Sequence, residues 1–222
     1  MIYTIYGKPK VGKTTFSLKG APRGKTAIIN ADDGLIGTDT SGFTVINDVS
    51  VSNLNREVLS PAFLKSHTHV VVDTATALHE HMLHAMSGGK TPTLSMWGAA
   101  NQALATLIRG LKGEGRKVVI LCQEKLVAPT EDWVSEDDDE EVIASVTLDL
   151  PQGAARSLIT MSDCIGRLYI ANVNGKYRRR LWLTPTPGVV AGARSAEYKG
   201  RPPFLPNPSL ERLDSLLGWT KS

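Results

Sequence analysis

The sequence predicts an α/β domain with a mainly parallel central sheet, and three observations support this. Short β-branched and apolar runs alternate with segments of helical spacing over residues 1–123. One run, residues 69–73 (HVVVD), has three consecutive valines, which suits a strand buried on both faces. A loop rich in glycine and lysine, GKPKVGKT, joins the first apolar run to the first helical segment. Alternation of this kind is typical of β-α-β units, which build a parallel sheet covered by helices.

Each strand of the predicted sheet is a run of β-branched, apolar or aromatic residues. We expect strands at residues 2–6, 26–30, 43–46, 69–73 and 117–122, with Gln123 at the end of the last one. Helices are expected between them, at residues 14–19, 77–86 and 97–111. In the third helix the apolar residues recur at intervals of three and four, so one of its faces should be buried.

The C-terminal half has a different pattern. Strands are expected at residues 142–150, 167–171 and 178–184, and Asn174-Gly175 between the last two is a strong hairpin signal. A proline-rich stretch, RPPFLPNPS, then leads to a short terminal helix that Asn207 or Ser209 could cap. We therefore expect an antiparallel hairpin extension after the parallel core.

The composition limits the class of protein. The 222 residues suffice for one large domain, and 41% hydrophobic and 21% charged residues are ordinary for a globular chain. The formal charge of +3 neither requires nor excludes nucleic acid, so any DNA site must be local. Cys122 and Cys164 lack a C-x-x-C spacing, which favours a reduced, cytoplasmic protein. No signal-peptide pattern and no apolar run near the ~20 residues that span a bilayer are present, so no membrane partner is expected.

The loop after the first strand matches G-x-x-x-x-G-K-T. In this motif successive backbone N–H groups wrap a polyphosphate, the lysine reaches the β- and γ-phosphates, and the threonine hydroxyl ligates Mg²⁺. The strand before it and the helix after it are the context that the motif requires; a basic surface turn is the alternative. We therefore expect ATP and Mg²⁺ as cofactors. The phosphate-binding residues would be Gly7, Lys8, Pro9, Lys10, Val11, Gly12, Lys13, Thr14 and Thr15.

Three polar positions at strand ends could complete this site. Asp73 follows the buried valines and would hold Mg²⁺ together with Thr14, although an aspartate there could simply cap a helix. Asp32 or Asp33 follows the second strand and could be the base that orients water, or part of a polar turn. Gln123 could sense the γ-phosphate and pass its presence to the following loop.

Two further clusters have simpler interpretations. All five histidines lie between residues 67 and 84, and His81 and His84 share a helix face, so a two-ligand zinc site is conceivable. A solvated helix face is the preferred interpretation. The acidic run at residues 135–141 (SEDDDEE) is expected to be a solvated loop tip.

Positive charge gathers in the C-terminal half. Tyr177 is interleaved with Lys176 and three arginines at residues 178–180, a combination that suits single-stranded nucleic acid. A charged exposed strand is the alternative. The candidate DNA-binding residues are Lys90, Arg156, Lys176, Arg178 and Arg179.

With these residues assembled, the chain resembles the RecA-core ATPases, and more narrowly the phage AAA-type nucleotide-binding proteins of single-strand annealing or recombination. The resemblance covers nearly the whole chain. It rests on the loop at residues 7–14 and on NADDGL (30–35), VVVDTATAL (70–78), VVILCQ (118–123), DLPQGAARSL (149–158), IGRLYI (165–170) and RRLWLTPTPGVVAGAR (179–194).

The resemblance implies a RecA-like P-loop NTPase fold and roles for particular residues. Asp32 takes the place of a water-activating glutamate and is one methylene shorter. Gln123 matches the γ-phosphate sensor, and Arg194 corresponds to a basic residue that reaches a neighbouring subunit's nucleotide. Residues 87–95 and 128–152 would be the loops that face DNA, although the second carries the acidic run.

The function implied is that of a Mg²⁺-dependent ATPase that binds single-stranded DNA and promotes annealing or strand pairing. Its partners would be further copies in a ring or filament, and a single-strand binding protein. We expect one domain over residues 1–222: a nucleotide-binding core (1–123), a variable acidic loop or hairpin (124–152) and a C-terminal part (153–222).

Two other ATP-dependent functions compete with this interpretation. Lys8 lies where partition-type switch ATPases have a second lysine, but Pro9 and Lys10 replace the two glycines that such loops use. A nucleoside kinase would need a basic lid over the phosphates, whereas the insert at residues 131–141 is mainly acidic. A switch ATPase acting on a protein partner is kept as the alternative function.

Overall fold

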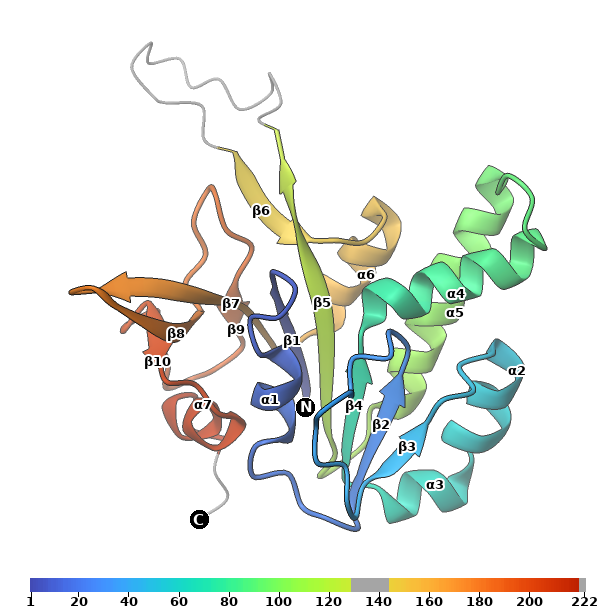
Figure 1. Ribbon diagram of the computed structural model, residues 1–222, viewed down its shortest axis with the longest axis horizontal. Coiled ribbons are helices and arrows are strands. Elements are labelled where there is room, and N and C mark those ends of the chain that lie inside the picture. Colours follow the sequence, from blue (N-terminus) through green and yellow to red (C-terminus); the bar gives the residue numbers. More distant parts are fainter. Residues whose placement is uncertain (129–143, 220–222) are drawn as a thin grey trace.

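The computed structural model describes residues 1–128 and 144–219, which form one large sheet with helices on both faces (Figure 1). The strand order is β10-β8-β7-β1-β5-β4-β2-β3. The parallel part consists of β1 (Ile2–Gly7), β2 (Thr26–Asn30), β3 (Thr44–Ile46), β4 (His69–Asp73), β5 (Lys117–Val127) and β7 (Cys164–Val173). The predicted α/β class, with a mainly parallel sheet covered by helices, is confirmed.

The antiparallel strands lie at the margins of this core. β8 (Lys176–Trp182) pairs with β7, and β10 (Phe204–Pro206) pairs with β8. The two-residue β9 (Gly192–Ala193) also pairs with β7. Asn174 and Gly175 both have positive φ values, 51° and 77°, as the predicted two-residue hairpin requires.

Helices cover the two faces of the sheet unequally. One face carries α2 (Val51–Asn53), η1 (Leu54–Val58), α3 (Pro61–Ser66), α4 (Ala75–Ser87), α5 (Leu94–Leu111) and α6 (Gln152–Met161). The other face carries α1 (Lys13–Leu18) and α7 (Leu210–Leu216). The valines of β4 alternate between the two cores: Val70 and Val72 pack on the α4–α5 side, whereas Val71 packs on the α1 side. All three are fully buried, as predicted for a strand covered on both faces.

β5 runs beyond its predicted end. It passes Gln123 and continues to Val127, where it pairs antiparallel with β6 (Ser145–Leu148). The extension was not predicted because residues 123–125 are polar, whereas the strand pattern requires apolar residues. Polar residues are tolerated there because one side of the two-stranded arm is not covered by a core. The acidic run at residues 135–141 lies outside the described residues.

The structure also contains elements that the sequence pattern did not predict: α2, η1, α3, α6, β9 and β10. Two of the short helices nevertheless begin with N-cap residues that are recognisable in the sequence. The Ser50 and Ser60 side chains accept hydrogen bonds from backbone N–H groups in the first turns of α2 and α3, and Pro61 starts α3. Ser209, one of the two predicted caps, accepts from the Arg212 N–H at the start of α7.

His69 makes stability depend on pH. Its ring Nε2–H donates to the Ser17 carbonyl at 3.2 Å and so joins β4 to α1, and burial lowers its pKa to about 4. The folded state therefore favours the neutral ring. Its contribution to stability is complete above pH ~6.5 and is lost as the pH falls toward 4, by up to about 3 kcal/mol.

Replacing His69 with glutamine keeps a donor for Ser17 and removes the titration. We expect the wild type to be the more stable protein at pH 7.5, and the difference in free energy of unfolding to shrink or reverse at pH 4.5. Urea denaturation of both proteins at the two pH values measures this. If the two proteins differ in free energy of unfolding by the same amount at pH 7.5 and at pH 4.5, His69 is not the group that titrates.

Candidate nucleotide-binding site

Two glycines shape the loop between β1 and α1. Gly7 ends β1, and a Cβ there would lie much closer than 3.0 Å to the carbonyl oxygen of Leu168 on β7. Gly12 directly precedes α1 with φ at 99°, a left-handed conformation that favours glycine. Lys10 between them also has a positive φ, 62°. The glycines of the motif are thus required by close packing against β7 and by the turn into α1.

Lys13 is the most constrained side chain of this loop. Only 6% of it is exposed, and its ammonium donates to Gly7 O at 2.8 Å, Lys8 O at 3.0 Å and Gln123 Oε1 at 2.8 Å. Burial lowers its pKa, and the nearby Asp73 carboxylate acts in the opposite direction. The ammonium is therefore directed into the loop, where phosphate oxygens could take over these hydrogen bonds.

Thr14 and Asp73 form a pair of oxygen donors next to Lys13. The Thr14 hydroxyl donates to Asp73 Oδ2 at 2.7 Å, and Asp73 is 2% exposed at the end of β4. Burial raises the pKa of Asp73 to about 6, with a contribution from the charge of Asp32. A buried carboxylate beside a hydroxyl is a donor set that suits Mg²⁺, a cation that prefers oxygen ligands. Both residues fit the predicted metal site.

Asp32 lies at the same edge of the sheet. The chain leaves β2 beside β4, where the Ala31 N–H donates to the Asp73 carbonyl at 2.7 Å. Asp32 is exposed, and one of its carboxylate oxygens accepts from the Gly34 N–H at 3.0 Å. Its charge raises the pKa of both Asp73 and Lys13, which places it within electrostatic reach of them. Asp33 is exposed with a positive φ of 53°. A role as base stays a prediction for either aspartate.

Gln123 connects this edge to two other elements. Its side chain accepts from Lys13, its backbone N–H donates to Thr76 Oγ1 at 3.0 Å, and its carbonyl accepts from the Asp149 N–H at 2.8 Å. The contact with Thr76 leads to the first turn of α4, and the contact with Asp149 leads to the end of β6. A change at Lys13 thus has a direct route to α4 and to the β5–β6 arm.

A family model described as an AAA domain matches residues 1–195. The chain belongs to this AAA-domain family. AAA domains are nucleotide-binding ATPase domains of the P-loop class, and the buried lysine, the threonine–aspartate pair and the surrounding loop are the candidate nucleotide site of this one. The match ends before β10 and α7. No curated protein matches the chain.

The AAA domain's β8 strand makes a contact that sequence reasoning missed. Arg179, a candidate for DNA binding, donates through Nε to the Val11 carbonyl of the P-loop at 3.0 Å. Arg179 is also the nearest neighbour that a Cβ on Gly12 would meet. The two partners are 168 residues apart, and no local pattern links them. Lys176, Tyr177 and Arg178 are exposed on the same strand.

A second unpredicted contact joins β5 and β7 at the C-terminal end of β1. Glu124 on β5 and Arg167 on β7 form a two-point ion pair, with Nε–Oε2 at 2.9 Å and Nη2–Oε1 at 3.2 Å. β1 lies between these strands, with Tyr6 opposite Arg167 and its last residue, Gly7, opposite Gln123, so the pair spans β1 at its C-terminal end. Paired charges of this two-point geometry fix orientation well.

The remaining basic candidates are scattered over the AAA domain. Lys90 is exposed in the turn between α4 and α5, and Arg156 is exposed on α6. Figure 1 shows the α4–α5 turn and the β7–β8 hairpin on opposite sides of the molecule. The structure therefore does not bring Lys90 together with Lys176 and Arg178.

Arg194 lies at the edge of the sheet opposite the P-loop. Its backbone N–H donates to the Asp163 carbonyl at 2.8 Å, and the Asp163 carboxylate accepts from the Ile2 N–H at 2.8 Å. Its side chain is 60% exposed and donates to the Thr160 carbonyl at 2.5 Å. Because β1 is roughly 17 Å long from Ile2 to Gly7, Arg194 cannot reach the nucleotide site of its own chain.

The histidines do not assemble a metal centre. Across residues 1–128 and 144–219, no group of three or more histidine, cysteine or acidic side chains is placed to hold a metal ion. His81 is exposed and its Nε2–H donates to the Ala31 carbonyl at 2.8 Å, and His84 is exposed as well. Within the same ranges, the helices are too short or too polar to cross a membrane.

Proposed function

We propose that this AAA domain is an ATP-hydrolysing, single-stranded-DNA-binding protein of phage recombination or repair that promotes annealing or strand pairing. One observation carries the proposal: the exposed basic strand β8, with Tyr177 between Lys176 and Arg178, lies beside the P-loop and is bonded to it through Arg179. Basic side chains with an interleaved aromatic ring suit a single strand, because they follow its phosphates while a base stacks on the ring.

Each residue of the site has its own role in the proposed hydrolysis of ATP. Lys13 donates to the β- and γ-phosphates, and Thr14 and Asp73 would hold Mg²⁺, which when bound neutralises charge that develops on the phosphates. Asp32 orients the attacking water from the end of β2. Gln123 contacts the γ-phosphate from β5, beside the Lys13 ammonium.

Gln123 also supplies the coupling between ATP and DNA. Lys13 now donates to Gln123, and phosphate oxygens compete for the same ammonium. A Gln123 side chain that turns from Lys13 to the γ-phosphate pulls on Thr76 and Asp149, to which its backbone is bonded. ATP binding is thereby relayed to the β5–β6 arm that follows Gln123, and single-stranded DNA favours the ATP-bound form.

Assembly into a ring or filament would complete the site. Arg194 is exposed at the sheet edge opposite its own P-loop, so its guanidinium meets a nucleotide only if a second copy packs against that edge. This arrangement makes hydrolysis depend on neighbouring subunits. A single-strand binding protein is a further partner in this proposal.

A switch ATPase that acts on a protein partner is the second candidate. It is favoured by large apolar side chains left in solvent near the sheet edge of the P-loop: Ile36 is 93% exposed and Leu126 is 74% exposed. Exposed apolar side chains of this size are common at protein interfaces. Stimulation of hydrolysis by a protein, with indifference to DNA, distinguishes this candidate from the first.

The deciding experiment measures ATP hydrolysis and single-stranded DNA binding at several salt concentrations. We expect DNA to stimulate hydrolysis, and Lys176→Ala to reduce the slope of log affinity against log salt by about 0.7, the value for one lost phosphate contact on a single strand. Lys65→Ala on α3 removes an exposed lysine far from β8 and should leave the slope unchanged. Absence of DNA affinity even at low salt would reject the DNA role.

A further inference from the structure

Asn30, the last residue of β2, carries a buried acceptor that the protein leaves without a donor. Across residues 1–128 and 144–219, its Oδ1 is the only buried side-chain nitrogen or oxygen that has no hydrogen-bond partner. Buried polar atoms nearly always have a partner, because an unpaired one has lost its hydration without compensation. The exception therefore points to a donor that is not part of the chain.

The position of Asn30 in the sheet places this acceptor beside the predicted metal site. Asn30 lies opposite Asp73, the last residue of β4, in the parallel pair of β2 and β4. The residues just before them, Ile29 and Val72, pack on the α4–α5 side of the sheet. Because side chains alternate along a strand, Asn30 and Asp73 both project to the α1 side. Neighbouring strands are ~4.8 Å apart, so Asn30 is adjacent to the carboxylate that accepts from Thr14.

Asn47 fixes the orientation of the Asn30 amide. The Asn30 Nδ2–H donates to Asn47 Oδ1 at 2.9 Å. Asn47 directly follows β3, which borders β2 on the side away from β4. The nitrogen and oxygen of a carboxamide point in different directions from its carbon, so the Asn30 oxygen is turned away from β3. It thus faces the β4 side, where Asp73 lies.

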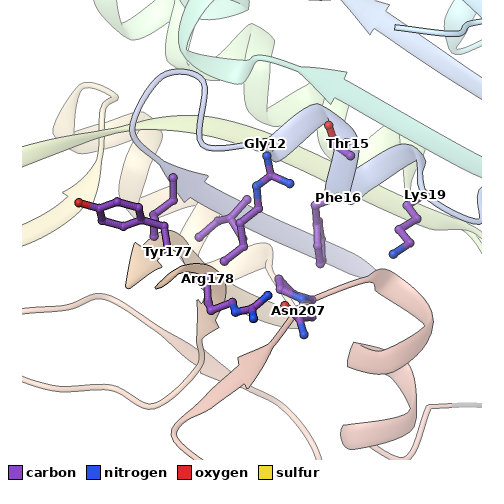
Figure 2. A pocket seen from close by; sticks show the side chains of 11 residues that line it. Gly12, Thr15, Phe16, Lys19, Tyr177, Arg178 and Asn207 are labelled. Atoms are coloured by element: carbon purple, nitrogen blue, oxygen red, sulfur yellow. The ribbon is translucent and has the colours of Figure 1, made fainter. Parts of the chain in front are cut away.

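The two sides of the P-loop differ in the groups that they present. β7 and β8 lie on one side of β1, and β4 and β2 lie on the other. On the first side is a pocket between α1 and the β7–β8 hairpin (Figure 2), and the described residues that line it include three cations, Lys19, Arg178 and Arg179. On the second side Asn30 and Asp73 present oxygen acceptors. A hydrated cation therefore suits the second side.

We propose that Asn30 helps to bind Mg²⁺ without touching the ion: its Oδ1 accepts a hydrogen bond from a water of the Mg²⁺ that Thr14 and Asp73 would hold, and Asn47 keeps the amide in place. Mg²⁺ usually keeps several waters when it binds to a protein, and groups that accept from such ligands orient them and strengthen metal binding. The proposal rests on the proposed ATPase function and adds two positioning residues to its metal site.

The test measures how much Mg²⁺ strengthens the binding of the ATP analogue AMP-PNP, by calorimetry in Mg²⁺ and in EDTA. Asn30→Ala should reduce this gain about tenfold, as expected for a residue that orients a metal ligand, and leave the affinity in EDTA unchanged. Asn30→Asp keeps an acceptor oxygen of the same reach and should retain the gain. Asn55→Ala is the control, because it removes an exposed amide from η1 on the opposite face of the sheet.

A second pair of variants tests the same row of side chains from its exposed end. Asn47 is exposed, so its replacement should leave folding intact. Asn47→Ala removes the acceptor of the Asn30 Nδ2–H and should reduce the gain by less than Asn30→Ala does. Asn47→Asp keeps that acceptor and should bind AMP-PNP with the gain of the wild type. This pair decides the matter even if the Asn30 variants do not fold.

The outcomes separate this inference from the proposed function. If Asn47→Ala and folded Asn30→Ala both keep the full gain from Mg²⁺, the inference is overturned and the ATPase function stands. An equal loss in Asn30→Asp and Asn30→Ala would also overturn it, because the amide would then act as a donor. If the wild type does not bind AMP-PNP, or binds it equally well in EDTA, the proposed Mg²⁺-dependent function itself fails.

Discussion

Replacing Lys13 with alanine is expected to lower the rate of ATP hydrolysis by about 10²–10³-fold, the effect of removing one charged donor that faces the transition state. The ammonium is buried and has three acceptors in the loop, so no other side chain in the described site can take its place against the phosphates. ATP affinity should fall as well, since in the proposed function the same donor contacts bound ATP. Steady-state phosphate release and calorimetric ATP binding measure the two effects.

Lys65→Ala is the matched control, because it removes the same charge from an exposed site on α3. Thermal melting of both variants separates a chemical effect from a folding effect. Lys13→Met adds a second check, since it keeps the length of the side chain in the buried site. Normal hydrolysis by a folded Lys13 variant would show that the P-loop of this AAA domain is not its ATP site.

The part of the site that the sequence predicted consists of positions at strand ends. Lys13 and Thr14 follow β1, Asp73 ends β4, and Gln123 follows the buried half of β5. Strands of a parallel sheet present their carboxyl ends at one edge, so the prediction that they are parallel already brings these residues together. The observed hydrogen bonds from Thr14 to Asp73 and from Lys13 to Gln123 agree with this reasoning.

The contact between Arg179 of the β7–β8 hairpin and the P-loop could not be predicted in the same way. β8 is two strands away from β1, and the side chain of Arg179 must cross β7 to reach the P-loop. Its neighbours in the sequence are also basic, so charge alone could not separate Arg179 from Lys176 or Arg178. Only the pairing of β7 with β1 and β8, together with the direction of one side chain, distinguishes them.

The elements missed by the sequence pattern share a physical cause. α2, η1 and α3 are each too short to show the helical recurrence of apolar residues, although their serine caps are readable afterwards. β10 lies in a proline-rich stretch and pairs with β8 at the margin of the sheet, where proline is tolerated. These segments are held by tertiary contacts more than by local preference.

Replacing Gly7 with alanine is expected to destabilise the protein by about 3 kcal/mol or more, the upper range for overpacking a tight site. The added Cβ would overlap the Leu168 carbonyl, which belongs to the backbone of a neighbouring strand and cannot rotate away as a side chain would. β1 and β7 would have to separate next to the P-loop. For a domain of this size we expect a fall in the melting temperature of roughly 6–12 °C.

Gly98→Ala is the matched control, because this helical glycine on α5 has nothing within 4 Å of its Cβ position. The same added methyl group should there raise stability by about 0.5–1 kcal/mol, since alanine favours a helix interior over glycine. A Gly7→Ala protein that melts with the wild type would contradict the close approach of β1 and β7. If that protein is destabilised but binds ATP normally when folded, then Gly7 is needed for the close packing of β1 against β7. The remaining loop residues then bind the phosphates without it.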